Sequence, residues 1–266
     1  MRVFFLPTER GQRFCVLHQA EQARAAVLVV PPFAEELNKS RRMMALVARA
    51  LAAVGLSCLI MDLEACGDSE GALEAASWSR WLADLGDAIH FLAAQHDVPL
   101  ALLGLRSGAL LAAELAQQVG PVRMVLWQPV GNGDLFLSQF LRLKLAAEVL
   151  GDAGSGAGSD QLKQQLLGGE AIEVAGYHIS PQLAQEISRR RLNDFTPPQC
   201  PIAWLELASE PGLGLSPAAQ RTVDGWRAKG AAIETQVLVG PPFWLTAEIT
   251  ECPSLVDASA DFLARA

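Results

Sequence analysis

The sequence is poor in the residues that mark several classes of protein. Charged residues make up only 19% of its 266 positions and hydrophobic residues 51%, so the chain can bury a large core and is not disordered. The formal net charge of -8 argues against non-specific binding to nucleic acid or to anionic lipid. No uncharged apolar run is long enough to cross a bilayer, and no signal peptide is visible. We therefore expect a globular protein that binds no nucleic acid and does not span a membrane.

Cysteines are few, and their spacing argues against two kinds of structural site. The five are scattered, odd in number and never spaced C-x-x-C: Cys15, Cys58, Cys66, Cys200 and Cys252. A disulfide framework or a zinc cluster needs paired spacing, so we expect a reducing, cytoplasmic environment. No P-loop, metal-ligand spacing or dinucleotide fingerprint is present either. We accordingly expect no metal and no cofactor.

Apolar runs and helical patterns alternate along most of the chain. After a predicted hairpin near the N-terminus, buried strands are expected at residues 25–30, 56–62, 99–104 and 123–128, with helices at 39–54, after Ser77 and at 107–119. Later strands at 201–207 and 232–240 enclose a helix, and a last helix lies around 256–264. This order predicts an α/β fold with a doubly wound, mostly parallel sheet of eight strands.

The alternation is interrupted after Pro129. Residues 131–195 hold an amphipathic helix at 135–150, a Gly/Ser-rich stretch at 151–160, one possible strand at 171–179 and a helix from Pro181. The composition of the Gly/Ser-rich stretch is typical of a mobile loop. We interpret residues 131–195 as a cap inserted into a core domain of residues 1–130 and 196–266. The cap is expected over the carboxyl ends of the strands, where ligands bind in such sheets.

The stretch GLRSG has the spacing of a nucleophile elbow, in which serine occupies the middle of G-x-S-x-G on a strained turn between a strand and a helix. Here Arg106 is in the middle, and Ser107 comes one position late. The turn needs small residues two positions before and after its apex, and Gly104 and Gly108 meet this need only if Arg106 is the apex. An arginine stays protonated and cannot attack a carbonyl, although it can hold an anion.

The chain resembles the α/β-hydrolase superfamily over nearly its whole length. The strand CLIMD runs into LEACGDSEG, which is similar to the D-x-x-G-x-G-x-S loop after the fourth strand of many α/β-hydrolases, and the elbow follows one helix later. Four segments further resemble the exosortase A system-associated hydrolases of the second type: PPFAEELNKSRRM, GLRSGALLA, AGYHIS and GPPFW. This resemblance implies the α/β-hydrolase fold, a nominal ester or thioester hydrolase, and a setting beside exopolysaccharide and protein-sorting genes.

The remaining members of a serine triad are missing from their usual places. The base belongs after the last strand, where Phe243 and Trp244 stand instead. The histidines are His18, His90, His96 and His178. Of these, only His178, in the expected cap, is a weak candidate for a base. Glu206 and Glu210 are the nearest candidates for the acid at the penultimate strand. Because no histidine is there to be oriented, we expect a salt bridge or a solvated carboxylate instead.

The loop after residues 25–30 reads PPFAEE, where related hydrolases have a His-Gly pair that donates an N–H to the oxyanion. Glu35 and Glu36 bring negative charge to this place, which opposes such chemistry. A semi-buried guanidinium, however, needs a carboxylate partner. We therefore predict that Arg106 forms an ion pair with Glu35 or Glu36 at the floor of a pocket. The predicted pocket also includes Phe33, Gln128 and Trp244.

Three functions remain open. The first is a non-catalytic protein that binds a small-molecule or acyl ligand in the capped pocket. The second is an esterase or thioesterase that uses Ser107 unconventionally, with His178 as its base. The third is an interaction or scaffold protein whose cap docks onto exopolysaccharide or sorting machinery. Labelling by a fluorophosphonate probe separates the second from the other two. The sequence gives no indication of the oligomeric state.

Overall fold

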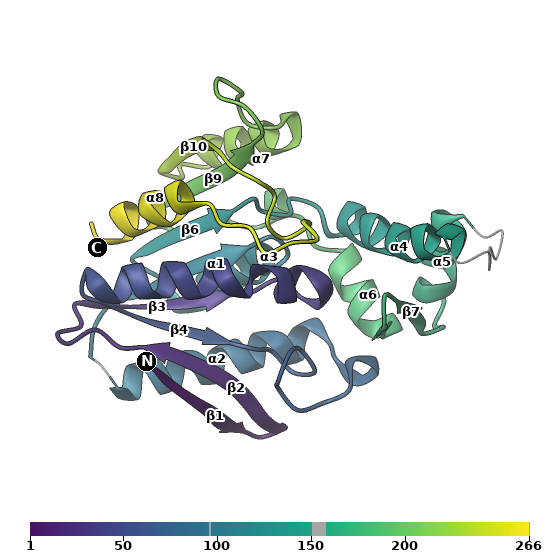
Figure 1. Ribbon diagram of the computed structural model, residues 1–266, viewed down its shortest axis with the longest axis horizontal. Helices are drawn as coiled ribbons and strands as arrows, with labels where there is room; N and C mark the ends of the chain where they lie inside the picture. Colours follow the sequence, from purple (N-terminus) through teal and green to yellow (C-terminus); the bar gives the residue numbers. More distant parts are fainter. Residues whose placement is uncertain (96, 151–157, 266) are drawn as a thin grey trace.

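The order of the strands places the candidate elbow near the middle of the sheet (Figure 1). The computed structural model describes residues 1–95, 97–150 and 158–265. Within these residues, eight strands form one sheet in the order β1-β2-β4-β3-β5-β6-β9-β10. The pairs β1–β2 and β2–β4 are antiparallel, and all the other neighbours are parallel. The predicted α/β-hydrolase fold with a mostly parallel sheet is confirmed.

The strands and helices of the sheet follow the predicted alternation. The strands are β1 (Arg2–Thr8), β2 (Gly11–His18), β3 (Ala25–Val30), β4 (Leu56–Met61), β5 (Leu100–Leu105), β6 (Arg123–Trp127), β9 (Ile202–Ala208) and β10 (Ile233–Val239). The helices are α1 (Ala34–Ala53), α2 (Trp78–Gln95), α3 (Gly108–Val119), α7 (Pro217–Ala228) and α8 (Pro253–Leu263), and a 3-10 turn, η1 (Leu73–Ala75), precedes α2. Helices α1 and α8 pack against each other in front of the sheet, while α2 and α3 lie behind it (Figure 1). Strands β3 and β4 are buried along their whole length, as their uninterrupted apolar runs predict.

Residues 131–195, named the insert below, leave the sheet after β6 and return to it at β9. They form α4 (Gly133–Leu150), α5 (Ser159–Leu167), the hairpin β7 (Ile172–Val174) and β8 (Tyr177–Ile179), α6 (Pro181–Ser188) and the 3-10 turn η2 (Leu192–Asp194). These elements lie beyond the carboxyl ends of the parallel strands (Figure 1). Within the described part of the chain, no helix combines the length and apolar character needed to cross a membrane.

The insert is attached to the amino end of α2. A Glu186 carboxylate oxygen on α6 accepts a hydrogen bond from the backbone N–H of Trp78 at 2.6 Å. The Trp78 indole N–H donates to Glu114 at 2.7 Å, and the same carboxylate accepts from Arg190 at 2.9 Å. Ser180 donates to the backbone carbonyl of Ala76. Polar groups of α2, α3 and α6 thus satisfy one another, which anchors this end of the insert.

Helix α1 begins earlier than the apolar pattern predicts. It starts at Ala34 rather than near Lys39, so Glu35 and Glu36 lie in its first turn and not in a loop. Carboxylates are favourable there because the unpaired N–H groups give the amino end of a helix a partial positive charge. The error arises because this turn presents acidic side chains where a search for apolar periodicity finds no signal.

Two further expectations for the insert need correction. The single strand predicted at residues 171–179 is a hairpin, because Ala175 and Gly176 have positive φ angles of 51° and 85° that turn the chain back on itself. Of the Gly/Ser-rich stretch at 151–160, predicted to be a mobile loop, residues 151–157 lie outside the described residues. Ser159 and Asp160 begin α5, a helix that the composition of this stretch did not indicate.

Candidate functional site

The turn between β5 and α3 has the geometry of an elbow with Arg106 at its apex. Arg106 has a φ of 54°, in the left-handed region that L-residues rarely adopt. A Cβ at Gly104 would lie 2.7 Å from the backbone of α3, and one at Gly108 would lie 2.2 Å from the carbonyl oxygen of Val30. Both glycines are therefore required by close approach of the backbone. Ser107 has ordinary right-handed angles and precedes the first helical residue.

The Arg106 guanidinium is held by partners within the protein. Its Nε and Nη2 atoms donate to Glu36 Oε1 at 3.2 and 3.1 Å, and Nη1 donates to the backbone oxygen of Gln128 at 3.1 Å. The guanidinium also lies 5.1 Å from the centre of the Trp244 ring, within the range of a cation–π interaction. The predicted ion pair is present, with Glu36 as the partner. Glu35 instead accepts a hydrogen bond from the hydroxyl of Tyr177.

Burial and charge act in opposite directions on Glu36. The side chains of Arg106 and Glu36 are each only 14% exposed. Burial raises the pKa of the Glu36 carboxyl above its usual range, and the adjacent Arg106 guanidinium counteracts part of that rise. The apex of the elbow is therefore a pair of charges that compensate each other in a largely desolvated place.

The weak catalytic candidates do not form a nucleophile–base pair. Ser107 is 3% exposed, and its hydroxyl caps no N–H of α3. His178 lies exposed on β8, 4.0 Å from Glu74 and 3.8 Å from Glu173. Among the described residues, no hydrogen bond joins Ser107 to a histidine.

The other histidines lie on different parts of the fold. His18 ends β2 and pairs with Cys58 near the start of β4, at the edge of the sheet away from the elbow. His90 is exposed on α2, and His96 lies outside the described residues.

Aromatic rings fill the place after β10. Phe243 packs edge-on against Trp127 at 6.1 Å and against Trp244 at 5.1 Å between ring centres. Both Phe243 and Trp244 are buried. The two residues that stand where a catalytic histidine belongs are thus part of the core, and Trp244 also packs against the Arg106 guanidinium.

Glu206 does not behave as expected for a carboxylate without a histidine. It is 5% exposed, and it accepts hydrogen bonds from the Trp204 indole at 3.2 Å and from the backbone N–H of Ser216 at 3.0 Å. The prediction of a salt bridge or a solvated side chain is therefore wrong for Glu206. Neutral donors from β9 and from the start of α7 satisfy it instead. Glu210 is exposed in the turn that follows β9.

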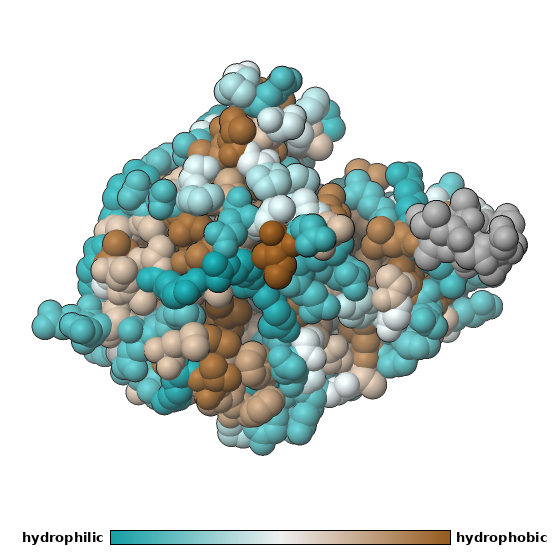
Figure 2. Space-filling model, viewed as in Figure 1, coloured by the Kyte–Doolittle hydropathy of each residue, from teal (hydrophilic) through white to brown (hydrophobic). Residues whose placement is uncertain are grey.

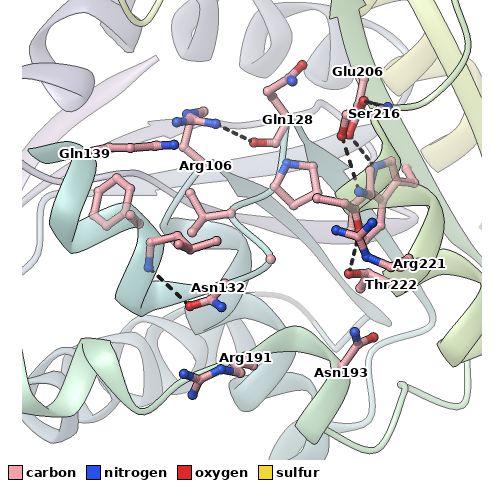
Figure 3. Close-up of a pocket in the computed structure, with 18 residues that line it drawn as sticks. Arg106, Gln128, Asn132, Gln139, Arg191, Asn193, Glu206, Ser216, Arg221 and Thr222 are labelled. Atoms are coloured by element: carbon pink, nitrogen blue, oxygen red, sulfur yellow. Dashed lines mark hydrogen bonds between the residues drawn. The ribbon is translucent and has the colours of Figure 1, made fainter.

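A cavity of about 350 Å³ lies beside Arg106, between the insert and α7 (Figure 3). Its walls come from the end of β6, from α4, from η2, from β9 and from α7. In the space-filling view the outline of the molecule is hollowed between the part that carries α7 and the insert (Figure 2). Of the six residues predicted for the pocket, Arg106 and Gln128 line this cavity.

The other predicted pocket residues lie elsewhere. Trp244 lines a neighbouring hollow of about 620 Å³, which Gln128 also borders. Phe33 is 3% exposed in an aromatic cluster with Trp81, Phe136 and Phe140, where it joins the core to α4 and does not reach the cavity. Glu35 and Glu36 are likewise not among the residues that line the cavity.

Several polar residues of the cavity were not identified from the sequence: Asn132, Gln139, Arg191, Asn193, Ser216, Arg221 and Thr222. The run Arg189–Arg190–Arg191 was the only visible signal. A run of like charges does not say which member faces a ligand, and here Arg190 pairs with Glu114 while Arg191 lines the cavity.

Comparisons with known proteins agree with this architecture. The family model described as serine aminopeptidase, S33, matches residues 21–192, more than half of the chain. Est1E from Butyrivibrio proteoclasticus with bound ferulic acid has a TM-score of 0.66 at 11% identity, over 98% of both chains. A carboxyl esterase from Bacillus coagulans, in complex with glycerol, has a TM-score of 0.66 at 12% identity, over 99% of this chain and 96% of its own.

A soluble variant of monoglyceride lipase from Saccharomyces cerevisiae has a TM-score of 0.67 at 10% identity, over 99% of this chain and 94% of its own. At such identities the likeness shows the fold alone. No curated protein matches the sequence. On the family model and the fold together, the chain belongs to the serine aminopeptidase S33 family of the α/β-hydrolase superfamily.

Proposed function

We propose that this protein binds a small molecule in the cavity between the insert and α7 and does not hydrolyse it by serine chemistry. One observation carries the proposal: Arg106 occupies the apex of the elbow, paired with Glu36 and packed on Trp244. In serine hydrolysis the apex residue is the nucleophile, and it needs a histidine as its base. A guanidinium is protonated at all relevant pH values, so it serves as neither nucleophile nor base.

Hydrolysis through Ser107 is the less favoured alternative. Attack by a serine requires a base within hydrogen-bond reach, and Ser107 is buried at the start of α3 while His178 is exposed beside two carboxylates. Glu36 would also oppose an oxyanion that formed next to it.

In the proposed arrangement residues 131–195 act as a cap on a core domain of residues 1–130 and 196–266. This division is supported by the cavity walls, because α4 and η2 of the insert face β9 and α7 of the core. The volume of about 350 Å³ falls within the range of small-molecule sites. We assign the ligand to acyl or ester-like molecules, which fit the apolar side of the cavity.

We further propose, from the four sequence segments alone, that the protein serves an exosortase or exopolysaccharide system from the cytoplasm. Those segments include Glu36, Arg106 and Trp244. The residues that carry the resemblance are thus the same ones that contact each other at the apex of the elbow. Co-purification of the tagged protein with components of such a system tests this role. Recovery of none of them would contradict it.

The main proposal is tested by covalent labelling and ester turnover. Wild-type protein, Ser107→Ala and Arg106→Ser are each incubated with a fluorophosphonate probe and with short p-nitrophenyl esters, beside an active serine esterase as positive control. We expect no adduct by mass spectrometry and no turnover above buffer for all three proteins. Arg106→Ser restores a hydroxyl at the apex but supplies no histidine. A stoichiometric adduct that disappears in Ser107→Ala would overturn the proposal.

A further inference from the structure

The residues that line the cavity carry a net positive charge, although the chain as a whole is negatively charged. Three arginines line it, Arg106, Arg191 and Arg221, against a single carboxylate, Glu206, in a chain of net charge -8. Glu36 compensates Arg106. The charges of Arg191 and Arg221 are therefore the ones that remain for a ligand.

Within the described residues, Arg191 and Arg221 lack the side-chain partner that Arg106 has. Among the residues that the structure describes, neither guanidinium forms an ion pair or a hydrogen bond with another side chain. Arg190, next to Arg191 in sequence, does pair with Glu114, so of these two neighbouring arginines it is Arg191 whose charge stays available at the cavity.

The backbone around Arg191 fixes its place in the cavity wall. Asn132 and Arg191 form an isolated antiparallel bridge, and the N–H of Leu192 donates to the carbonyl of Gly131. The Asn132 side-chain oxygen is engaged by the N–H groups of the first turn of α4. Figure 3 shows Asn132, Arg191 and Asn193 along the lower side of the cavity, with Arg221 above Asn193.

The carboxylate of Glu206 is already used by the wall itself. One of its oxygens accepts from the Trp204 indole and the other from the Ser216 N–H. It therefore helps to hold β9 and α7 together and does not pair with either free arginine.

Apolar side chains lie on one side of the cavity, from the segment after β6 and from α4, next to the polar side chain of Gln139. Val130 and Phe136 are buried side chains there, and Leu135 is 59% exposed. A ligand that matches both sides of the cavity has an apolar part as well as an anionic one.

We propose that the ligand is an amphipathic anion, with an acyl chain along Leu135 and Phe136 and a carboxylate or phosphate group held by Arg191 and Arg221. This inference rests on the proposed function and adds the chemical class of the ligand. A guanidinium offers two parallel N–H donors, a geometry that suits both carboxylate and phosphate oxygens.

The probes for the test are octanoate, octyl phosphate, inorganic phosphate and neutral octan-1-ol, each titrated calorimetrically into the full chain. We expect at least one of the two amphipathic anions to bind about tenfold or more tightly than octan-1-ol. Inorganic phosphate should bind more weakly than octyl phosphate because it leaves the apolar wall uncovered. The tighter of the two amphipathic anions identifies the head group.

The arginines are tested by Arg191→Ala and Arg221→Ala, with Arg189→Ala as the matched control. Arg189 is an exposed arginine two residues from Arg191 and does not line the cavity, so its loss removes the same charge from the molecule. Each cavity variant should bind the anion about tenfold more weakly and octan-1-ol unchanged, whereas Arg189→Ala should bind the anion as wild type does.

Three results would overturn the inference: octan-1-ol binding as tightly as the anions, Arg189→Ala weakening the anion as much as Arg221→Ala does, or no probe binding at all. None of them decides whether Ser107 is a nucleophile, which the labelling experiment reads separately. Circular dichroism of each variant establishes that its fold is retained.

Discussion

The side chain at position 106 brings a permanent charge to a place where a serine hydrolase uses a neutral hydroxyl. Glu36 meets that charge from the first turn of α1, and Trp244 packs against it from the segment after β10. Each of the three comes from a loop or helix end that in a serine hydrolase supplies part of the catalytic site. Together, Glu36 and Trp244 provide the Arg106 guanidinium with its interactions from within the protein.

Replacing Arg106 should destabilise the fold in a pH-dependent way. In Arg106→Ala the Glu36 carboxylate keeps its burial and loses its partner, so the free energy of unfolding should fall by about 1–3 kcal/mol at neutral pH. A carboxyl whose pKa is raised in the folded state is destabilising when ionised, so its contribution improves as pH falls through the raised value toward the usual glutamate range. Urea unfolding of variant and wild type should therefore show the difference shrinking on acidification.

Arg42→Ala provides the matched control for this experiment. It breaks the Arg42–Glu251 pair, whose N–O distance is 2.6 Å but whose side chains are 47% and 39% exposed. An exposed pair contributes about 0–1 kcal/mol, so this loss should be small and nearly independent of pH. Adding Glu36→Gln to Arg106→Ala should recover part of the lost stability. A constant loss across pH would show that Glu36 is not the cause.

At the level of single residues, the sequence predicts the pair better than the cavity. The spacing of Gly104 and Gly108 identifies Arg106 as the apex, and the need of a buried guanidinium for a carboxylate points to the Glu35–Glu36 dipeptide. Arg191 and Arg221 are not predicted from the sequence because their positions at the cavity depend on how the insert runs and on where α7 packs. Neither is set by local sequence pattern.

The elbow as an element is determined by backbone contact between β3, β5 and α3. Gly108→Ala should lower the free energy of unfolding by about 3 kcal/mol or more, because a Cβ there meets the carbonyl oxygens of Val30 and Pro31 at 2.2 and 2.5 Å. Gly86→Ala is the control. It lies in the interior of α2 with open space around its Cβ position, so it should be neutral or stabilising by up to about 1 kcal/mol. Equal losses in chemical denaturation of the two variants would contradict this account.

The elements themselves divide into those that local pattern determines and those that it does not. The sequence predicts strand β3 with its observed ends, because a fully apolar run there meets two prolines. The start of α1 was missed because an acidic first turn carries no apolar signal. The turn in the β7–β8 hairpin depends on a positive φ at Ala175, and an alanine in a sequence does not indicate such a conformation.

At the scale of the whole molecule, the reactivity of the five cysteine thiols measures how well the core excludes solvent. All five are free and buried. Burial raises the pKa of Cys200 to about 11 and of Cys15 to about 12, and it raises the pKa of Cys58 and Cys66 as well. Since the thiolate is the reactive form, the native protein should react with a disulfide reagent far more slowly than a model thiol at pH ~8. In denaturant all five should react promptly. Rapid modification of a native thiol would reveal local opening.

The hydrogen bond from the Trp78 N–H to Glu186 has a consequence for biosynthesis. Its two residues are 108 positions apart. At about 5–20 residues per second, a ribosome needs roughly 5–20 s to make the intervening chain. Once Gln95 has been added α2 has its full sequence, but the carboxylate that completes its first turn does not exist until Glu186 is made. The amino end of α2 therefore reaches its final state only after α6 has emerged from the ribosome. The rate of translation thus sets the earliest time at which α6 can dock onto α2.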